Sequence, residues 1–173
     1  YFASEGNSAL KKENRDVQVI DGAILKACVQ ALIDGPAAKG LRRTIPEGTT
    51  IRGISIKDNV ATVDFSGEFA KTNGLDEVTA RLSVVNTLTE INGIERVRLR
   101  IEGEDMIGPS GLPLGAMSPA LLDDDGKPVP GRNVSLTLYF SDSQAMYIVP
   151  EKRDVAVSNN DRLEKVIFIE LMK

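Results

Sequence analysis

The spacing of apolar residues in the first part of the chain predicts two helices. One spans residues 23–34 and ends at Gly35-Pro36, because glycine caps a helix and proline cannot continue it. The other lies near residues 76–91. The first helix is expected to bury a stripe with helical spacing, formed by Ile24, Ala27, Cys28, Ala31 and Leu32. The second is expected to bury Val78, Leu82, Val85, Leu88 and Thr89.

Alternating apolar and polar residues predict strands around these helices. Residues 51–57 and 60–65 flank the turn Asp58-Asn59, a pattern typical of a β-hairpin. A last strand is expected over residues 94–101, and an extended arm from Ser8 to Val19 precedes the first helix. The residues expected to point inward from these strands are Ile54, Ile56, Val63, Phe65, Val97, Leu99 and Ile101. Together the elements predict an α+β fold, a two-layer sandwich with two helices on one face of a mainly antiparallel sheet.

Part of the chain is repeated. Tyr1-Phe2 returns as Tyr139-Phe140, and E-N-R-D-V-Q-V from residue 13 returns as E-K-R-D-V-A-V from residue 151, at the same separation. We expect the charged residues of this motif to fix the arm through charge-assisted hydrogen bonds. They are Arg15 and Asp16 in the first copy and Arg153 and Asp154 in the second.

The repeat also predicts how the chain is divided. Residues 1–103 are expected to form a complete first domain. Residues 104–132 are rich in glycine and proline and are interpreted as a linker, one too apolar to be free coil. Residues 133–173 are interpreted as the N-terminal portion of a second, truncated domain.

Composition narrows the possible functions. The 173 residues carry a net charge of −4, which disfavours a nucleic-acid partner. The absence of histidine excludes imidazole catalysis and histidine metal sites. The single cysteine excludes an internal disulfide and a multi-thiolate metal site. No apolar run approaches the roughly 20 residues that span a bilayer. No metal or cofactor is therefore expected.

For each candidate catalytic residue, a structural role is favoured over a catalytic one. Cys28 lies on the predicted apolar stripe and has no histidine to activate it. The acidic run 123–125 lacks the glutamate that would complete a calcium-binding loop. Asp64 is expected to point outward from its strand without an acidic partner. No catalytic residues are predicted.

One charged surface is a candidate for binding. Arg96, Arg98 and Arg100 share the sheet face opposite the helices, about 6–7 Å apart along the strand. They could bind the acidic groups of a partner or of another copy of the chain. They could equally be a solvated face balanced by acidic neighbours such as Asp64. Both interpretations stay open.

Several glycine, proline and core positions resemble the GerMN domain family. They are Tyr1-Phe2, E-N-R-D-V at 13–17, D-G-P at 34–36, I-P-E-G-T at 45–49, V-A-T-V-D-F-S at 60–66, V-N-T-L-T-E at 85–90 and G-I-E-R-V at 93–97. The similarity covers most of residues 1–103 and resumes at 136–173, so the repeat resembles a tandem arrangement of GerMN domains.

This resemblance implies a core like the ring-building motif and a role without catalysis in sporulation and spore germination. It implies an extracytoplasmic lipoprotein anchored to a membrane between mother cell and forespore, where it supports a channel complex. Its partners would be envelope proteins of that complex or further copies of itself. The family offers no catalytic residues to carry over.

Two other classes of function stay open as alternatives. A carboxylate-based hydrolase would need two acidic side chains roughly 5–9 Å apart across a cleft. A nucleic-acid-binding module of the KH type would need a G-x-x-G loop and a basic face, and the sequence supplies only the arginines at 96, 98 and 100.

Overall fold

The computed structural model describes residues 1–6, 9–19, 23–72, 74–108, 110–123, 125–129, 131–141, 147–158 and 163–172. Ser8, where the predicted arm begins, and Asp124 of the acidic run lie outside the described residues. The chain forms two compact units. The first comprises residues 1–120 with 124–127, and the second comprises 121–123 with 128–173.

The predicted α+β class is confirmed, and most strand pairs are antiparallel. The helices are α1 (Ile24–Asp34), the short 3-10 helix η1 (Gly67–Lys71), α2 (Gly74–Leu88) and α3 (Leu163–Leu171). The strands of the first unit are β1 (Phe2–Ser4), β2 (Leu10–Lys11), β3 (Leu41–Arg42), β4 (Ile51–Lys57), β5 (Val60–Phe65), β6 (Arg96–Ile101), β7 (Glu104–Asp105) and β8 (Ala116–Met117). Those of the second are β9 (Gly131–Ser141) and β10 (Ile148–Ser158).

The main sheet of the first unit is built on the predicted hairpin. Strands β4 and β5 pair antiparallel around Asp58 and Asn59, whose φ angles of 50° and 59° lie in the left-handed region that these residue types tolerate. Strand β6 then pairs parallel to β5, and η1 and α2 connect the two strands. The strand order β4-β5-β6-β7, with β8 also paired to β6, leaves β4 at one end of the sheet.

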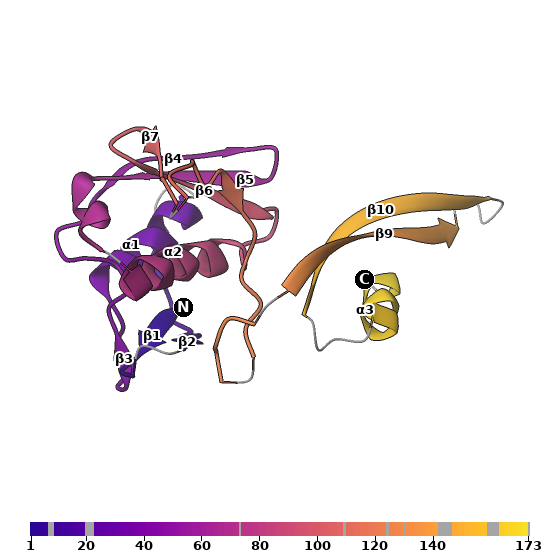
Figure 1. Ribbon diagram of the computed structural model, residues 1–173, viewed down its shortest axis with the longest axis horizontal. Helices are drawn as coiled ribbons and strands as arrows, with labels where there is room; N and C mark the ends of the chain where they lie inside the picture. The colour runs from indigo at the N-terminus through magenta and orange to yellow at the C-terminus, as the bar shows by residue number, and fades with distance from the viewer. Residues whose placement is uncertain are drawn as a thin grey trace. The chain divides into compact units, whose positions relative to one another are not determined.

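The core lies between this sheet and the helices. Figure 1 shows α1 and α2 against one face of the main sheet, with the small β2-β1-β3 sheet on the other side of the helices. Phe65 and Phe69 stack with ring centroids 4.5 Å apart. The prediction that the sheet and α2 supply the core is confirmed for Val63, Phe65, Val85, Leu88, Val97 and Leu99, which are all buried.

Of the buried stripe predicted for the first helix, Leu32 is confirmed and the other four residues were wrong. Helix α1 buries Leu25, Val29, Leu32 and Ile33, whereas Ile24 is 44% exposed. Residues Ala27, Cys28 and Ala31 are half-buried. The helix is apolar around much of its circumference, so periodicity alone allowed two stripes. The packing against β4 and α2 selects the one that carries the larger side chains.

The inward faces of α2 and β4 also differ from the prediction. Val78 and Leu82 are half-buried, while Ser83 is fully buried and its hydroxyl lies 2.9 Å from that of Thr44. A small hydroxyl side chain with a partner allows close packing where a larger apolar residue had been expected. Ile56 was expected to be inside but is 57% exposed, because β4 is the end strand.

Residues that the sequence assigns to the linker contribute strands to the first unit. Strands β7 and β8 pair with β6, and Met106 is buried in the core. The domain boundaries at 103/104 and 132/133 stay predictions. Among the described residues, none of the helices combines the length and the apolarity that crossing a bilayer requires.

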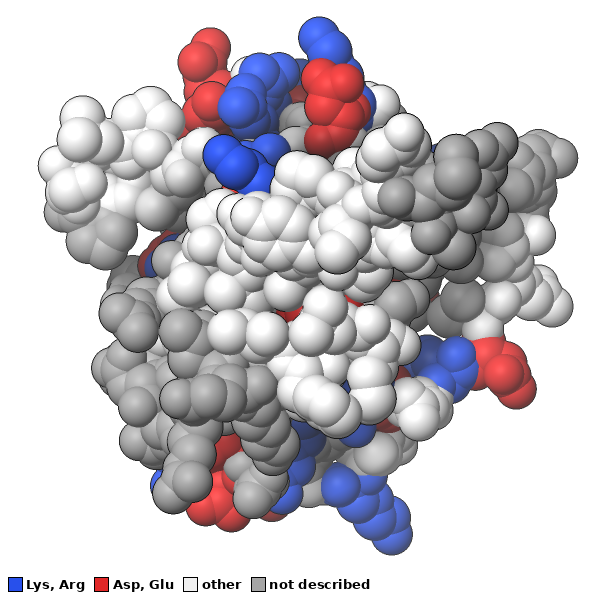
Figure 2. All heavy atoms as spheres, turned by 90° about the vertical axis from the view of Figure 1, so that its right-hand side faces the viewer, with Lys and Arg blue, Asp and Glu red and all other residues white. Residues whose placement is uncertain are grey.

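The second unit repeats the first hairpin in the same register. Phe2 faces Lys11 between β1 and β2, and the corresponding Phe140 faces Val149 between β9 and β10. The strands of this second hairpin are much longer, with 11 residues each. Many apolar side chains of the unit are exposed, and Figure 2 shows uncharged residues across the middle of one face of the molecule with charged residues toward its edges. The exposed apolar side chains of the second unit are those of Tyr139, Tyr147, Ile148, Val149, Phe168, Ile169, Leu171 and Met172.

Candidate binding surfaces

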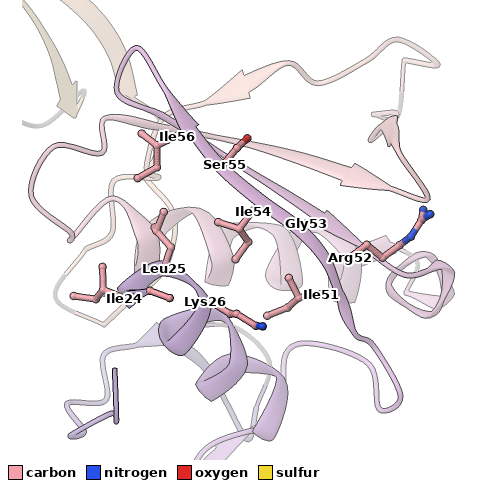
Figure 3. Close-up of a pocket in the computed structure, with 10 residues that line it drawn as sticks. Ile24, Leu25, Lys26, Ile51, Arg52, Gly53, Ile54, Ser55 and Ile56 are labelled. Atoms are coloured by element: carbon pink, nitrogen blue, oxygen red, sulfur yellow. The ribbon is translucent and has the colours of Figure 1, made fainter. Parts of the chain in front are cut away.

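An apolar groove of about 480 Å³ lies between the start of α1 and strand β4. Figure 3 shows Ile51, Ile54 and Ile56 along the strand above the helix, with Leu25 extending from α1 toward them. Arg52 extends away from the groove at one end of the strand. The remaining lining residues are Ala23, Ile24, Lys26, Gly53 and Ser55.

The lining of this groove favours binding of apolar groups over chemistry. The described residues that line it include no carboxylate and no thiol, and the one hydroxyl among them belongs to Ser55. Its guanidinium, on Arg52, is already paired with Glu102 at 2.9 Å and lies 3.8 Å from Asp64. The groove therefore offers isoleucine side chains beside the end strand of a sheet, the combination found where proteins bind extended polypeptides.

The predicted arginine face is partly neutralised within the chain. Arg100 pairs with Asp105 through nitrogen and oxygen atoms 3.0 Å apart, and Arg98 lies 3.8 Å from the other oxygen of Asp105. Arg96 is exposed and makes no ion pair with the residues that the structure describes. Strand β7, which the sequence did not predict, supplies this acidic partner. One part of the face is thus balanced by an acidic neighbour, while Arg96 is exposed. The role of the face in binding stays a proposal.

The repeated arginine connects the arm to the end of the helix. Arg15 donates from Nη1 to the carbonyl oxygen of Ala31 at 3.4 Å and from Nη2 to that of Gly35 at 3.0 Å. It also bonds Glu13, and its guanidinium lies 5.4 Å from the centroid of the Phe2 ring. One planar side chain thus joins the hairpin, the arm and the last turn of α1, whose carbonyls need donors.

The second copy repeats three of these contacts, to the glutamate, to one backbone carbonyl of the helix and to the phenylalanine ring. Arg153 donates from Nε to Glu151 at 2.6 Å and from Nη1 to the carbonyl oxygen of Glu170 at 2.7 Å. Its guanidinium lies 5.1 Å from the centroid of the Phe140 ring. Asp16 and Asp154, the acidic residues of the motif, are exposed in both copies. We call the contacts of Arg15, and those of Arg153, the arginine latch.

The carboxylate of Glu13 is the buried part of the first latch. Its side chain is 8% exposed, and it accepts hydrogen bonds from the backbone N–H groups of Ala37 and Ala38 at 3.2 and 3.1 Å. Burial alone would raise the pKa of Glu13, but the hydrogen bonds from Arg15 and from these backbone groups outweigh burial and lower its pKa below the ordinary value. The carboxylate is therefore held charged by its donors.

A second groove, of about 410 Å³, contains charged groups that bind one another. The Tyr1 hydroxyl donates to Glu90 at 2.8 Å, and Lys12 donates to the other carboxylate oxygen at 2.8 Å. Burial and the hydrogen bond to Glu90 raise the pKa of the Tyr1 hydroxyl to about 12. Cys28 also lines this groove, and burial raises the pKa of its thiol. A protonated thiol is a poor nucleophile, which agrees with the structural interpretation of Cys28.

Asp64 likewise has a structural role. Its carboxylate accepts a hydrogen bond from the backbone N–H of Gly103 at 2.9 Å, which holds the tight turn between β6 and β7. Glu102 and Gly103 in that turn have φ angles of 54° and 88°, in the left-handed region.

The comparison with known proteins identifies the family. Residues 1–106 match the family described as "Germane: Sporulation and spore germination". The chain belongs to this family. It is 30% identical over 139 residues to the spore germination protein GerM of Bacillus subtilis, an alignment that covers 74% of this chain and 37% of that protein. The chain thus spans little more than a third of its curated relative.

One solved structure agrees with the assignment of the fold. The tandem GerMN domains of the sporulation protein GerM from Bacillus subtilis superpose with a TM-score of 0.57 at 23% sequence identity, covering 95% of this chain and 61% of that one. The first GerMN domain of the same protein gives a TM-score of 0.47 at 29% identity, covering 64% of this chain and 82% of that one. The predicted resemblance to tandem GerMN domains is confirmed.

Sequence reasoning missed the groove beside β4. Ile56 of the strand and Ile24 of the helix, which line this groove, were both expected to point into the core. The order of elements along the chain was a usable signal. A strand that pairs with its hairpin partner on one side and, across a helical connection, with the next strand on the other leaves that hairpin partner at the edge of the sheet.

Proposed function

We propose that this chain is a protein-interaction module, without catalytic activity, that acts in sporulation and spore germination. Membership of the Germane family supports the process. The single observation that supports a role in interaction is the groove beside β4, where exposed isoleucines lie next to a sheet edge with which no described strand pairs. Such a surface binds polypeptide through backbone hydrogen bonds and apolar contact.

The proposal extends to location and partners. The module would act outside the cytoplasm as part of a membrane-anchored lipoprotein and would support an envelope-spanning complex between mother cell and forespore. Its partners would be envelope proteins of that complex or further copies of the chain. The resemblance to GerMN domains supports this location, and the exposed isoleucines of the groove beside β4 support a role in assembly.

A second surface on the first unit is proposed as a further contact. Arg96 is exposed and makes no ion pair with the residues that the structure describes, while Arg98 and Arg100 share a single carboxylate. This imbalance leaves excess positive charge on the β6 face, which suits an acidic partner.

The test replaces Ile56 by lysine in the full-length protein, expressed from its own locus in the spore-forming host. The exposed side chain tolerates a charge without unfolding the unit, but a charge in the groove should prevent docking. We expect normal abundance with a loss of sporulation or germination efficiency. The matched control is Ile148→Lys, which places the same charge at another exposed isoleucine. Wild-type efficiency of Ile56→Lys would contradict the proposal.

A further inference from the structure

The open edge of β4 presents its hydrogen-bonding groups at defined positions. Lys57 faces Val60 across a two-residue turn, and in such a hairpin this closing pair is hydrogen-bonded. Alternation along an antiparallel ladder then makes Ser55 and Gly53 hydrogen-bonded to β5 as well. The N–H and C=O groups of Ile54 and Ile56 therefore point outward, where no described strand pairs with β4.

The same isoleucines supply the apolar surface beside that edge. Ile54 is half-buried and Ile56 is 57% exposed, and both line the groove with Ile24, which is 44% exposed. A strand added to β4 would satisfy the outward backbone groups and place its own alternate side chains over this groove. The edge and the groove therefore suit an occupant with apolar residues two positions apart.

We propose that the occupant is a second copy of β4, added antiparallel about a twofold axis through Ser55. This register sets Ile54 opposite Ile56 of the second copy, and Ile56 opposite Ile54, so both outward residues of each strand make hydrogen-bonded pairs. Registers centred on Ile54 or Ile56 would extend the pairing into the bulge at Arg52 or into the turn at Asp58. The central register alone stays within the regular part of the strand.

The charged residues at the ends of the strand lie outside this paired segment. Arg52 lies at the bulge and is paired with Glu102 at 2.9 Å, and Asp58 lies in the turn. Within the segment, Lys57 lies opposite Gly53 of the second copy. The strand is therefore complementary to itself in its backbone and apolar groups, which is what an interface with twofold symmetry needs. This inference rests on the proposed interaction role of the groove and names its partner.

A disulfide at the axis tests the register in the full chain. Cys28 is first replaced by serine, which leaves the chain without cysteine. Ser55→Cys is then introduced, because the central pair would be non-hydrogen-bonded, with Cα atoms about 4.5 Å apart, a separation that a disulfide spans. Under mild oxidation we expect a disulfide-linked dimer as the main product, seen on a non-reducing gel and by mass spectrometry.

Lys57→Cys in the same background is the matched control. It is exposed on the same strand, but in this register the two copies of residue 57 are offset by about 13 Å along the strand. We expect it to stay monomeric under the same oxidation. Equal cross-linking of both variants would reveal random collision and overturn the proposal, as would failure of Ser55→Cys to cross-link.

Sedimentation equilibrium provides a readout that needs no cysteine. The wild-type chain should dimerise, Ile56→Lys should shift it to monomer, and Ile148→Lys should leave the dimer unchanged. A monomeric wild-type chain would overturn the dimer. If Ile56→Lys still impaired germination in that case, the proposed function would stand with a different protein strand as the occupant.

Discussion

The two copies of the repeated element have the same local structure but very different surroundings. Both form a hairpin in the same register, followed by a helix attached through an arginine latch. In the first copy Leu32 of α1 is 2% exposed, whereas its counterpart in α3, Leu171, is 43% exposed. The local contacts are thus encoded within each copy, while burial depends on the sheet that only the first copy has among the described residues.

The largest expected effect comes from truncating this pair of leucines. Leu32→Ala should destabilise the first unit by about 2–5 kcal/mol, since it opens a cavity in a packed core. Leu171→Ala should cost less than about 1 kcal/mol, because the side chain is already partly in water. Chemical denaturation, monitored by hydrogen exchange in each unit separately, measures the loss of stability in both variants. Equal costs would mean that α3 is buried in solution as deeply as α1.

Glu13→Gln should have the next largest effect and should change the pH dependence of stability. Because the folded pKa of Glu13 is lowered, its charge contributes stability above the unfolded value near 4.5, and that stability is lost as pH falls through the folded pKa. The variant should lose about 1–3 kcal/mol of its free energy of unfolding at neutral pH, and that free energy should fall less steeply as the pH is lowered. Glu151→Gln, at a side chain 52% exposed, should change stability by less than about 1 kcal/mol. A variant whose free energy of unfolding fell as steeply in acid as that of the wild type would contradict this role of Glu13.

Replacing the latch arginine by lysine should affect both copies alike. Lysine keeps the charge but lacks the planar fork that reaches a carboxylate and a carbonyl at once. Arg15→Lys and Arg153→Lys should each cost about 1 kcal/mol and speed amide exchange in the last turn of α1 and α3, respectively. An effect in one copy alone would show that the two latches differ in solution despite their common geometry.

The smallest effect is expected when Arg96, Arg98 and Arg100 are all replaced by glutamine, which removes their three positive charges. All three side chains are at least partly exposed, and exposed ion pairs contribute about 0–1 kcal/mol. Stability of both units should be nearly unchanged, while any binding to acidic partners should weaken as it does when salt is added to the wild type. A large loss of stability would assign these arginines to the fold instead of to binding.

Much of the fold could be predicted because its signals are local. Turn residues placed the β4–β5 hairpin, and Gly35 after α1 adopts the positive φ of 91° that glycine allows. The candidate surfaces were harder to predict. Asp105 neutralises part of the arginine face from β7, a strand of two residues that no periodicity could reveal.

The sequence by itself determined the class of fold and the repeat, since each depends on local patterns or on matching segments, whereas the partners of the repeated arginine became visible only in the structure. The tertiary structure alone decided which stripe of α1 is buried, and that β4 is the end strand with Ile56 exposed beside a groove. The physical reason is that a strand or a helix carries its own hydrogen-bonding pattern and polarity, but not its neighbours. Exposure, and with it the surface that can bind another chain, is a property of the packing between elements.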